Sequence, residues 1–117
     1  MEDRFSQQLK KGILELLVLE LLCRKATYGY ELLTLLKEHS GGLFCLKEGT
    51  LYPILYRLED DGLIVSSWSQ GDGRITPKKI YVPTEAGRQE IARRKEIWNS
   101  FSMTIDRFLQ EAPTREI

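Results

Sequence analysis

Residues 48–62 read EGTLYPILYRLEDDG, and this stretch decides the fold of the chain. Its apolar side chains recur at the three- and four-residue spacing that lines one side of an α-helix. They are Leu51, Ile54, Leu55 and Leu58. The positions between these apolar residues, and the two just before Leu51, are Gly49, Thr50, Tyr52, Pro53, Tyr56 and Arg57. One side of this helix is therefore predicted to face a core, and the other side, with its mixture of hydroxyl and guanidinium groups, is predicted to have a role of its own.

A second helix precedes this one and is separated from it by a tight connection. Thr27 is the expected N-cap, and the helix is expected to stop at Ser40–Gly42. The sequence thus predicts a helix, a turn and a helix, the latter running from about Glu48 to Asp60 and ending at Gly62. Pro53 lies too far into this helix for its missing N–H to cost nothing, so a local distortion is expected there.

A β-hairpin is predicted after the helices. Residues 63–68 (LIVSSW) and 79–82 (KIYV) have the composition of strands, and residues 69–78 (SQGDGRITPK) contain turn residues. Arg74, Lys78 and Lys79 occur in a segment, residues 73–84, that contains no acid. The tip of the hairpin is therefore predicted to be basic.

The last helix is predicted from about Glu85 to Leu109, with Thr84 as its N-cap and residues 111–117 as a frayed tail. Its aromatic and aliphatic residues follow a heptad-like spacing, which usually indicates contact with another helix. The first helix, which contains residues 9–22, is apolar around most of its circumference. It must be buried on two sides, either against a second subunit or at the centre of the chain. The predicted dimer interface comprises Leu9, Ile13, Leu14, Leu17, Ile91, Trp98, Phe101, Ile105 and Phe108.

Composition predicts one domain of mainly α structure. The chain has 117 residues, of which 42% are hydrophobic and 29% charged, as in soluble globular proteins. Its longest apolar run, residues 16–19, is far too short to span a membrane, and no secretory signal is recognisable, so a cytoplasmic protein is expected. Within the domain, residues 1–83 are predicted to form one region, residues 84–110 the dimerisation helix and residues 111–117 the tail.

Residues for catalysis or metal binding do not stand out. The single histidine, His39, is next to a predicted helix end, where capping explains it better than catalysis. Cys23 and Cys45 form no CxxC pair, which favours reduced thiols over a disulfide or a metal site. No nucleophile elbow or phosphate-binding loop is present either. The prediction is therefore a protein that is not an enzyme and has no metal or cofactor.

The order α-α-α-β-β-α with a basic hairpin is that of a winged helix-turn-helix, in which the second helix of the pair enters the DNA major groove. The net charge of zero, from 17 basic and 17 acidic residues, means that any attraction to DNA must be local. Gly49 and Thr50 stand at the leading end of the recognition helix, where a backbone N–H or a hydroxyl can bond a phosphate or a base edge. Tyr52, Tyr56 and Arg57 would flank them, although packing against the hairpin or the first helix explains Tyr52 equally well.

The residues also carry a family resemblance. YGYEL (residues 28–32), EGTLYPILYRLEDDGLI (residues 48–64), a Gly-Arg hairpin and YVPTEAG (residues 81–87) together resemble the PadR family of bacterial transcriptional regulators. The resemblance covers nearly the whole chain. It implies a winged-helix homodimer that binds a pseudo-palindromic operator in double-stranded DNA, usually as a repressor, and is released by a small molecule. The single C-terminal helix is similar to that of the short subgroup of the family.

Transferred by position, the resemblance implies DNA contacts at Tyr28, Gly49, Thr50, Tyr52, Arg74 and Lys78 or Lys79. The sequence departs from the usual pattern of the family in two places. The hairpin inserts residues 75–77, and Lys47 replaces the expected polar cap, which adds a charge that attracts phosphate. The full set of predicted DNA-binding residues is Tyr28, Lys47, Gly49, Thr50, Tyr52, Tyr56, Arg57, Arg74, Lys78 and Lys79.

Some members of this family bind flat aromatic molecules at the dimer interface, and Trp98 resembles the tryptophan found there. Trp98 and Phe101 are thus the hypothetical contacts of a small aromatic effector, while packing in a helix seam is the simpler explanation of Trp98. Two other functions stay open from the sequence. The neutral charge balance favours a winged helix that binds proteins and not DNA, and a carrier of small molecules around Trp98 would require a cavity.

Overall fold

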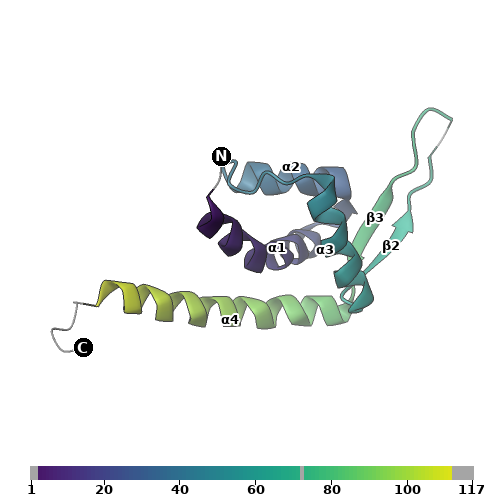
Figure 1. Cartoon of the computed structure of the whole chain (residues 1–117). Helices are drawn as coiled ribbons and strands as arrows, with labels where there is room; N and C mark the ends of the chain where they lie inside the picture. The colour runs from purple at the N-terminus through teal and green to yellow at the C-terminus, as the bar shows by residue number, and fades with distance from the viewer. Residues whose placement is uncertain (1–2, 72, 112–117) are drawn as a thin grey trace.

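The structure is a computed structural model that describes residues 3–71 and 73–111, so most of the predicted tail lies outside the described residues. The elements follow in the order α1 (Arg4–Arg24), β1 (Thr27–Tyr28), α2 (Gly29–His39), α3 (Glu48–Asp60), β2 (Ile64–Trp68), β3 (Lys79–Pro83) and α4 (Glu85–Gln110). In Figure 1, α1, α2 and α3 form a cluster, the β2–β3 hairpin projects from the end of α3, and α4 runs along one side. The predicted fold, mainly α with a winged helix-turn-helix, is confirmed.

The sheet corrects one part of the sequence prediction. It has three antiparallel strands in the order β1-β3-β2, whereas the sequence predicted only the hairpin. Thr27, expected to cap α2, is instead a buried residue of β1 paired with Tyr81, and Tyr28 is the N-cap of α2. A strand of two residues is too short to show alternation, so the pairing depends on a partner distant in sequence.

The core lies between α1, α2, α3 and the sheet. Among its fully buried side chains are Val18 and Leu19 of α1, Leu32 of α2 and Leu55 of α3. All four apolar residues of the EGTLYPILYRLEDDG stretch are buried, which confirms the predicted core side of α3. Burying one leucine of this kind contributes about 2 kcal/mol to stability.

The sequence left two explanations for the apolar α1, burial at the centre of the chain and burial against a second subunit, and they apply to different halves of the helix. Its C-terminal half is central within the chain, since five leucine and valine residues there are buried. Its N-terminal half is open, with Phe5 and Leu9 exposed at 69% and 58%. The chain therefore covers the second half of α1 by itself and leaves the first half for another surface.

Helix α3 is continuous through Pro53, so the expected distortion does not interrupt it. Gly49, four residues earlier, has open space around it, which removes the side-chain crowding that a proline would otherwise meet. At the other end Gly62 has a left-handed φ of 75°, and the N–H groups of Gly62 and Leu63 bond the carbonyls of Glu59 and Leu58. This pattern is a Schellman motif, and it directs the chain from α3 into β2.

Helix α4 is fixed at its start and along its first half. The Thr84 hydroxyl accepts a hydrogen bond from the Gly87 N–H (3.0 Å) and donates one to the Gly62 carbonyl (2.7 Å), so the predicted N-cap is confirmed and also joins α4 to the end of α3. Further along, Lys95 pairs with Glu20 of α1 at 2.5 Å. Partial burial raises the pKa of Glu20, but the bonds from Lys95 and Arg24 outweigh it and the pKa is lowered.

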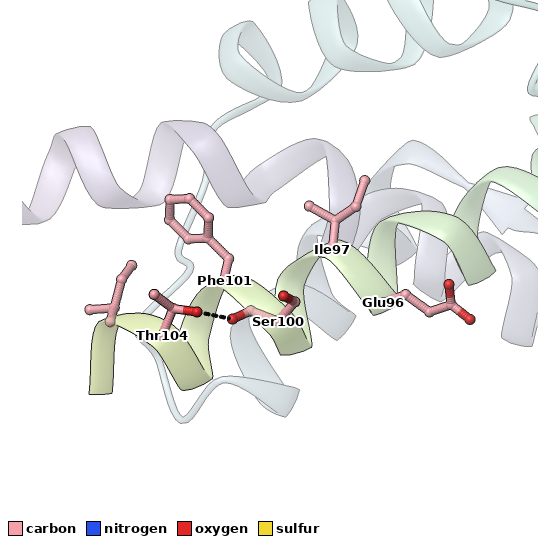
Figure 2. A pocket seen from close by; sticks show the side chains of 6 residues that line it. Glu96, Ile97, Ser100, Phe101 and Thr104 are labelled. Atoms are coloured by element: carbon pink, nitrogen blue, oxygen red, sulfur yellow. Dashed lines mark hydrogen bonds between the residues drawn. The ribbon is translucent and has the colours of Figure 1, made fainter. Parts of the chain in front are cut away.

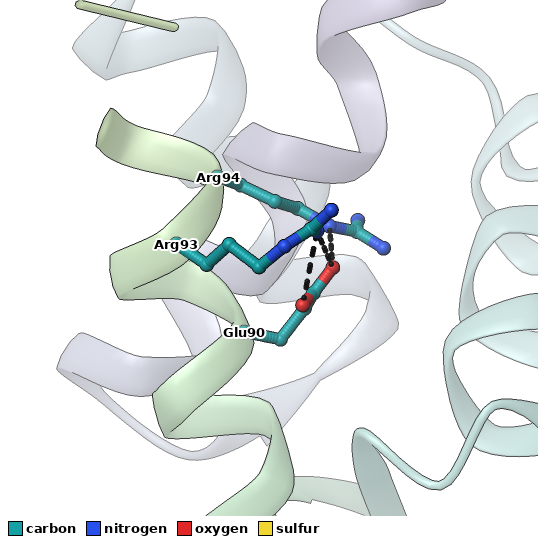
Figure 3. A network of polar contacts seen from close by, with 3 residues as sticks. All are labelled: Glu90, Arg93 and Arg94. Carbon is teal, nitrogen blue, oxygen red and sulfur yellow. Dashed lines mark hydrogen bonds and ion pairs between the residues drawn. The ribbon is translucent and has the colours of Figure 1, made fainter. Parts of the chain in front are cut away.

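A second group of charges lies on α4 itself. Figure 3 shows Arg93 and Arg94 converging on Glu90, at 3.1 Å and 2.7 Å from its Oε2. The hydrogen bond from Arg94 holds the pKa of Glu90 below its usual value. Such i,i+3 and i,i+4 pairs add to the stability of the helix itself. None of the helices in the described part of the chain combines the length and apolar content that a membrane crossing requires.

Candidate nucleic-acid interface

The side of α3 that faces away from the core is exposed at its N-terminal end. Lys47, Gly49, Thr50 and Pro53 are all exposed there. The N-cap Lys47 makes no side-chain capping bond, although its carbonyl accepts the N–H groups of Thr50 (3.0 Å) and Leu51 (3.1 Å). The first N–H groups of a helix carry partial positive charge and lack partners within the helix. This end of α3 can therefore receive an anionic group such as a phosphate.

Two predicted contact residues of α3 have partners within the chain. Tyr52 is half-buried, and its hydroxyl lies 2.7 Å from the place where a Cβ on Gly29 would stand, so its ring packs against the start of α2. Neither the hairpin nor the first helix, the packing partners considered from the sequence, is this neighbour. Arg57 Nε lies 3.4 Å from Glu15 Oε2 of α1. This pair is largely exposed and so weak, and a phosphate can displace it.

The β2–β3 hairpin forms a wing that stands away from the helices (Figure 1). Its base is closed by two hydrogen bonds, from Ser69 N–H to the Lys78 carbonyl (2.7 Å) and from Lys78 N–H to Ser69 Oγ (2.8 Å). Beyond this base, Arg74 is exposed in the turn. The turn of the wing thus presents a cationic side chain outside the core.

Lys78 and Lys79 lie on opposite faces of the sheet, because successive strand residues alternate. Lys78 Nζ stands 4.2 Å above the ring of Tyr28, which makes a cation–π contact between the wing and the start of α2. Lys79 Nζ stands 5.7 Å above the ring of Tyr81, on the face that packs against α3. The sequence left open which lysine contacts DNA, and the structure gives the two residues different surroundings.

A polar cluster beneath the wing was missed by the sequence analysis. Ser66 Oγ of β2 donates a hydrogen bond to Glu59 Oε2 of α3 at 2.6 Å. The Tyr81 hydroxyl is buried and has no protein partner among the described residues. Burial raises the pKa of Tyr81 to about 12, and Glu59 adds to the shift. The period-two alternation of β3 could have placed Tyr81 inside, but its neighbours come from α3.

The residues of the predicted dimer interface are divided by the structure. Leu14 and Ile91 are buried in the core of the chain itself, and Ile13 and Leu17 are half-buried. The exposed members are Leu9, Trp98, Phe101, Ile105 and Phe108. Leu9 belongs to the open half of α1, and the other four belong to the C-terminal half of α4.

A depression of about 420 Å³ runs along α4. It is lined by Glu96, Ile97, Ser100, Phe101, Thr104 and Ile105. Figure 2 shows Ile97 and Phe101 projecting from the same side of the helix. Of the two residues proposed for an effector, Phe101 belongs to this depression and Trp98 does not. In the described part of the chain, acids, cysteines and histidine form no group of three that could hold a metal ion.

Comparison with known proteins connects this arrangement to one family. The profile of the family described as "Transcriptional regulator PadR-like family" matches residues 18–93. An uncharacterized protein of Lysinibacillus sphaericus is 29% identical over 101 residues, which are 86% of this chain and 91% of that protein. The negative transcriptional regulator PadR of Bacillus subtilis is 32% identical over 79 residues, which are 68% of this chain but only 43% of that regulator.

Solved structures show the same fold. A PadR family transcriptional regulator from Eggerthella lenta has a TM-score of 0.80 and 32% identity, over 91% of this chain and 89% of its own. A PadR-like transcriptional regulator from Bacillus cereus has a TM-score of 0.77 and 31% identity, over 90% of this chain and 99% of its own. The helices, the wing and α4 are therefore shared with regulators of known structure.

Proposed function

The chain belongs to the PadR-like family of transcriptional regulators, and from this premise we propose that it is a homodimer that binds a pseudo-palindromic operator in double-stranded DNA. Its effect on transcription is repression, and a small aromatic molecule releases it from the operator. The observation that carries the proposal is the exposed N-terminal end of α3 together with a wing whose residues 73–84 include Arg74, Lys78 and Lys79 and no acid.

Recognition of bases is proposed for α3. Thr50 is exposed in the first turn of the helix, where its hydroxyl can bond a base edge or a phosphate. The exposed Gly49 has open space around it, so a nucleic-acid backbone can approach closely there. Lys47 supplies a charge at the same end. The wing is proposed to bind phosphates through Arg74 and Lys79, which fixes orientation without reading sequence.

The dimer is proposed to form through α4 and the open half of α1. Large apolar side chains are exposed on these helices, among them Phe5 (69%), Phe101 (61%) and Phe108 (76%). A concentration of large exposed apolar side chains on two helices is typical of a protein–protein interface. A second copy of the chain covers this surface and presents two recognition helices related by a two-fold axis. They should read half-sites about one helical turn apart, roughly 34 Å.

Selection from a random duplex DNA pool tests the proposal. The unmodified chain is expected to enrich a two-fold symmetric site, because two symmetric α3 helices read the same bases twice. The double variant Arg74→Glu, Lys79→Glu is expected to enrich none, since it replaces attraction to phosphates by repulsion. No enrichment by unmodified protein that is folded and dimeric would contradict the proposal and favour a protein-binding winged helix.

Thr50→Ala is expected to change which sequences are preferred. Thr50 is exposed and makes no contact with the core, so the variant should fold normally while losing one hydroxyl at the base edges. The same selection, run on the variant, measures the effect. A preference identical to that of the unmodified chain would remove Thr50 from the residues that read the operator.

Repression and release have separate support. The Bacillus subtilis relative is named a negative transcriptional regulator. For release, Phe101 lines the depression on α4, and Trp98 is half exposed at 44% on the same helix. In a Trp68→Phe variant, planar aromatic compounds are expected to quench the fluorescence of Trp98, the remaining tryptophan. If no compound of a broad aromatic panel quenches it, effector binding at this surface is wrong.

A further inference from the structure

Trp68 is the most exposed large aromatic side chain of the wing, and it is not among the residues proposed to bind DNA. It is the last residue of β2, and 68% of its surface is accessible. β2 is an edge strand, because the order of the sheet is β1-β3-β2. Tryptophan is usually well buried in folded proteins, and those that remain at a surface commonly contact a partner.

The register shows which face of the sheet Trp68 belongs to. Trp68 pairs with Lys79, and the next pair on the same face is Ser66 with Tyr81. Ser66 bonds Glu59 of α3. Tyr81 is buried, and Lys79 Nζ lies above its ring. The exposed Trp68 and the half-buried Lys79 therefore form the outermost strand pair on the α3 side of the wing, immediately outward from the core.

This pair adjoins the exposed side of α3. Ser66, on this face of β2, bonds Glu59 of α3, and the rings of Tyr52 and Tyr56 belong to the same helix. The two rings are 6.3 Å apart, and Tyr56 is 53% exposed. The surface thus continues from the outer side of α3 through Tyr56 to the root of the wing.

The chemistry of this surface fits the backbone of nucleic acid. An indole has an apolar face that can pack on a deoxyribose ring and an N–H that can only donate a hydrogen bond, as a phosphate oxygen requires. The lysine opposite supplies a positive charge, and residues 73–84 include no acid. A basic protein segment would be repelled by the lysine. An acidic protein segment would find few hydrogen-bond donors here besides the lysine and the indole, so the backbone of DNA fits this surface better.

We propose that Trp68 and Lys79 together clamp the sugar–phosphate backbone of bound DNA, with the indole against a deoxyribose and the ammonium group against a phosphate. The inference rests on the proposed function. It assigns the α3 side of the wing to DNA binding, whereas Lys78 is assigned a structural role. Lys78 positions the wing from the other face by its contact with Tyr28.

Affinity measured by fluorescence anisotropy tests this clamp. The probes are the symmetric duplex enriched in the selection and an unrelated duplex of equal length. Trp68→Ala is expected to weaken binding to both about tenfold, because a backbone contact carries no sequence information. Trp68→Phe, which keeps a ring but loses the N–H, should have an affinity between those of the unmodified chain and Trp68→Ala. The matched control is Val65→Ala, since Val65 is 53% exposed on the same strand but on the opposite face.

The salt dependence of DNA affinity distinguishes the contribution of Lys79 from that of Trp68. Lys79→Ala should lower the slope of log affinity against log salt by about one, while Trp68→Ala should leave it unchanged. Thermal midpoints equal to that of the unmodified chain show that the variants are folded. Affinities of Trp68→Ala within twofold of Val65→Ala for both duplexes would overturn the clamp and favour a protein partner for Trp68. Failure of the unmodified chain to bind either duplex would overturn the proposed function itself.

Discussion

A chain carrying Phe101→Glu and Phe108→Glu is expected to be monomeric at concentrations at which the unmodified chain is dimeric. The two rings are 61% and 76% exposed in the single chain, in the C-terminal half of α4. In a dimer they would be buried, and a buried unpaired carboxylate costs several kcal/mol. A monomer holds only one half-site, so affinity for the symmetric operator should fall about 100-fold or more.

Sedimentation and DNA binding, measured on the same samples, check this expectation. The matched control is Gln89→Glu with Ala92→Glu, which adds the same two charges to exposed positions of α4. By helical spacing Ala92 lies on the other side from Phe101 and Phe108, and Gln89 lies about 110° around the helix from them, so neither shares their face. The control should remain dimeric and bind DNA. A dimeric Phe101→Glu, Phe108→Glu variant would show that the subunits meet elsewhere.

Gly87→Ala is expected to destabilise the fold by about 3 kcal/mol, although glycine to alanine inside a helix normally stabilises it. A Cβ at this position would stand 2.0 Å from the Leu63 carbonyl oxygen. That carbonyl cannot easily retreat, because it accepts the Thr84 N–H at 3.0 Å and Leu63 N–H is bonded to Leu58. The start of α4 would have to separate from the end of α3.

Chemical denaturation at fixed protein concentration measures the change in unfolding free energy. The matched control is Gly12→Ala in α1, where an added Cβ meets nothing within 4 Å. It should stabilise the chain by about 0.5–1 kcal/mol, the ordinary helical gain. If Gly87→Ala behaves like Gly12→Ala, the close approach of α4 to Leu63 does not exist in solution.

Local signals account for most of the elements that the sequence predicted. The three- and four-residue spacing from Leu51 to Leu58 located α3, and Gly62 marked its end. Thr84 located the start of α4. Each of these features depends on residues within about two helical turns of each other, so it can be recognised from a short stretch of sequence.

Contacts between distant residues account for what the sequence missed. β1 exists because Thr27 and Tyr28 pair with β3, more than fifty residues later. The packing of Tyr52 on Gly29 and the pairing of Arg57 with Glu15 have no local signal either. Each of these contacts requires the helices and the sheet to be assembled first.

Sequence alone predicts the order of the helices and the hairpin, the core side of α3 and the basic character of the wing, because hydrophobic period, caps and turn residues act over short distances. Contacts between distant parts of the chain place Lys78 and Lys79 in different surroundings and put Trp68 on the same face of the sheet as Lys79, toward α3. The face of a wing residue depends on strand register, and register is fixed by packing against α3, not by the residue's own neighbours in the chain.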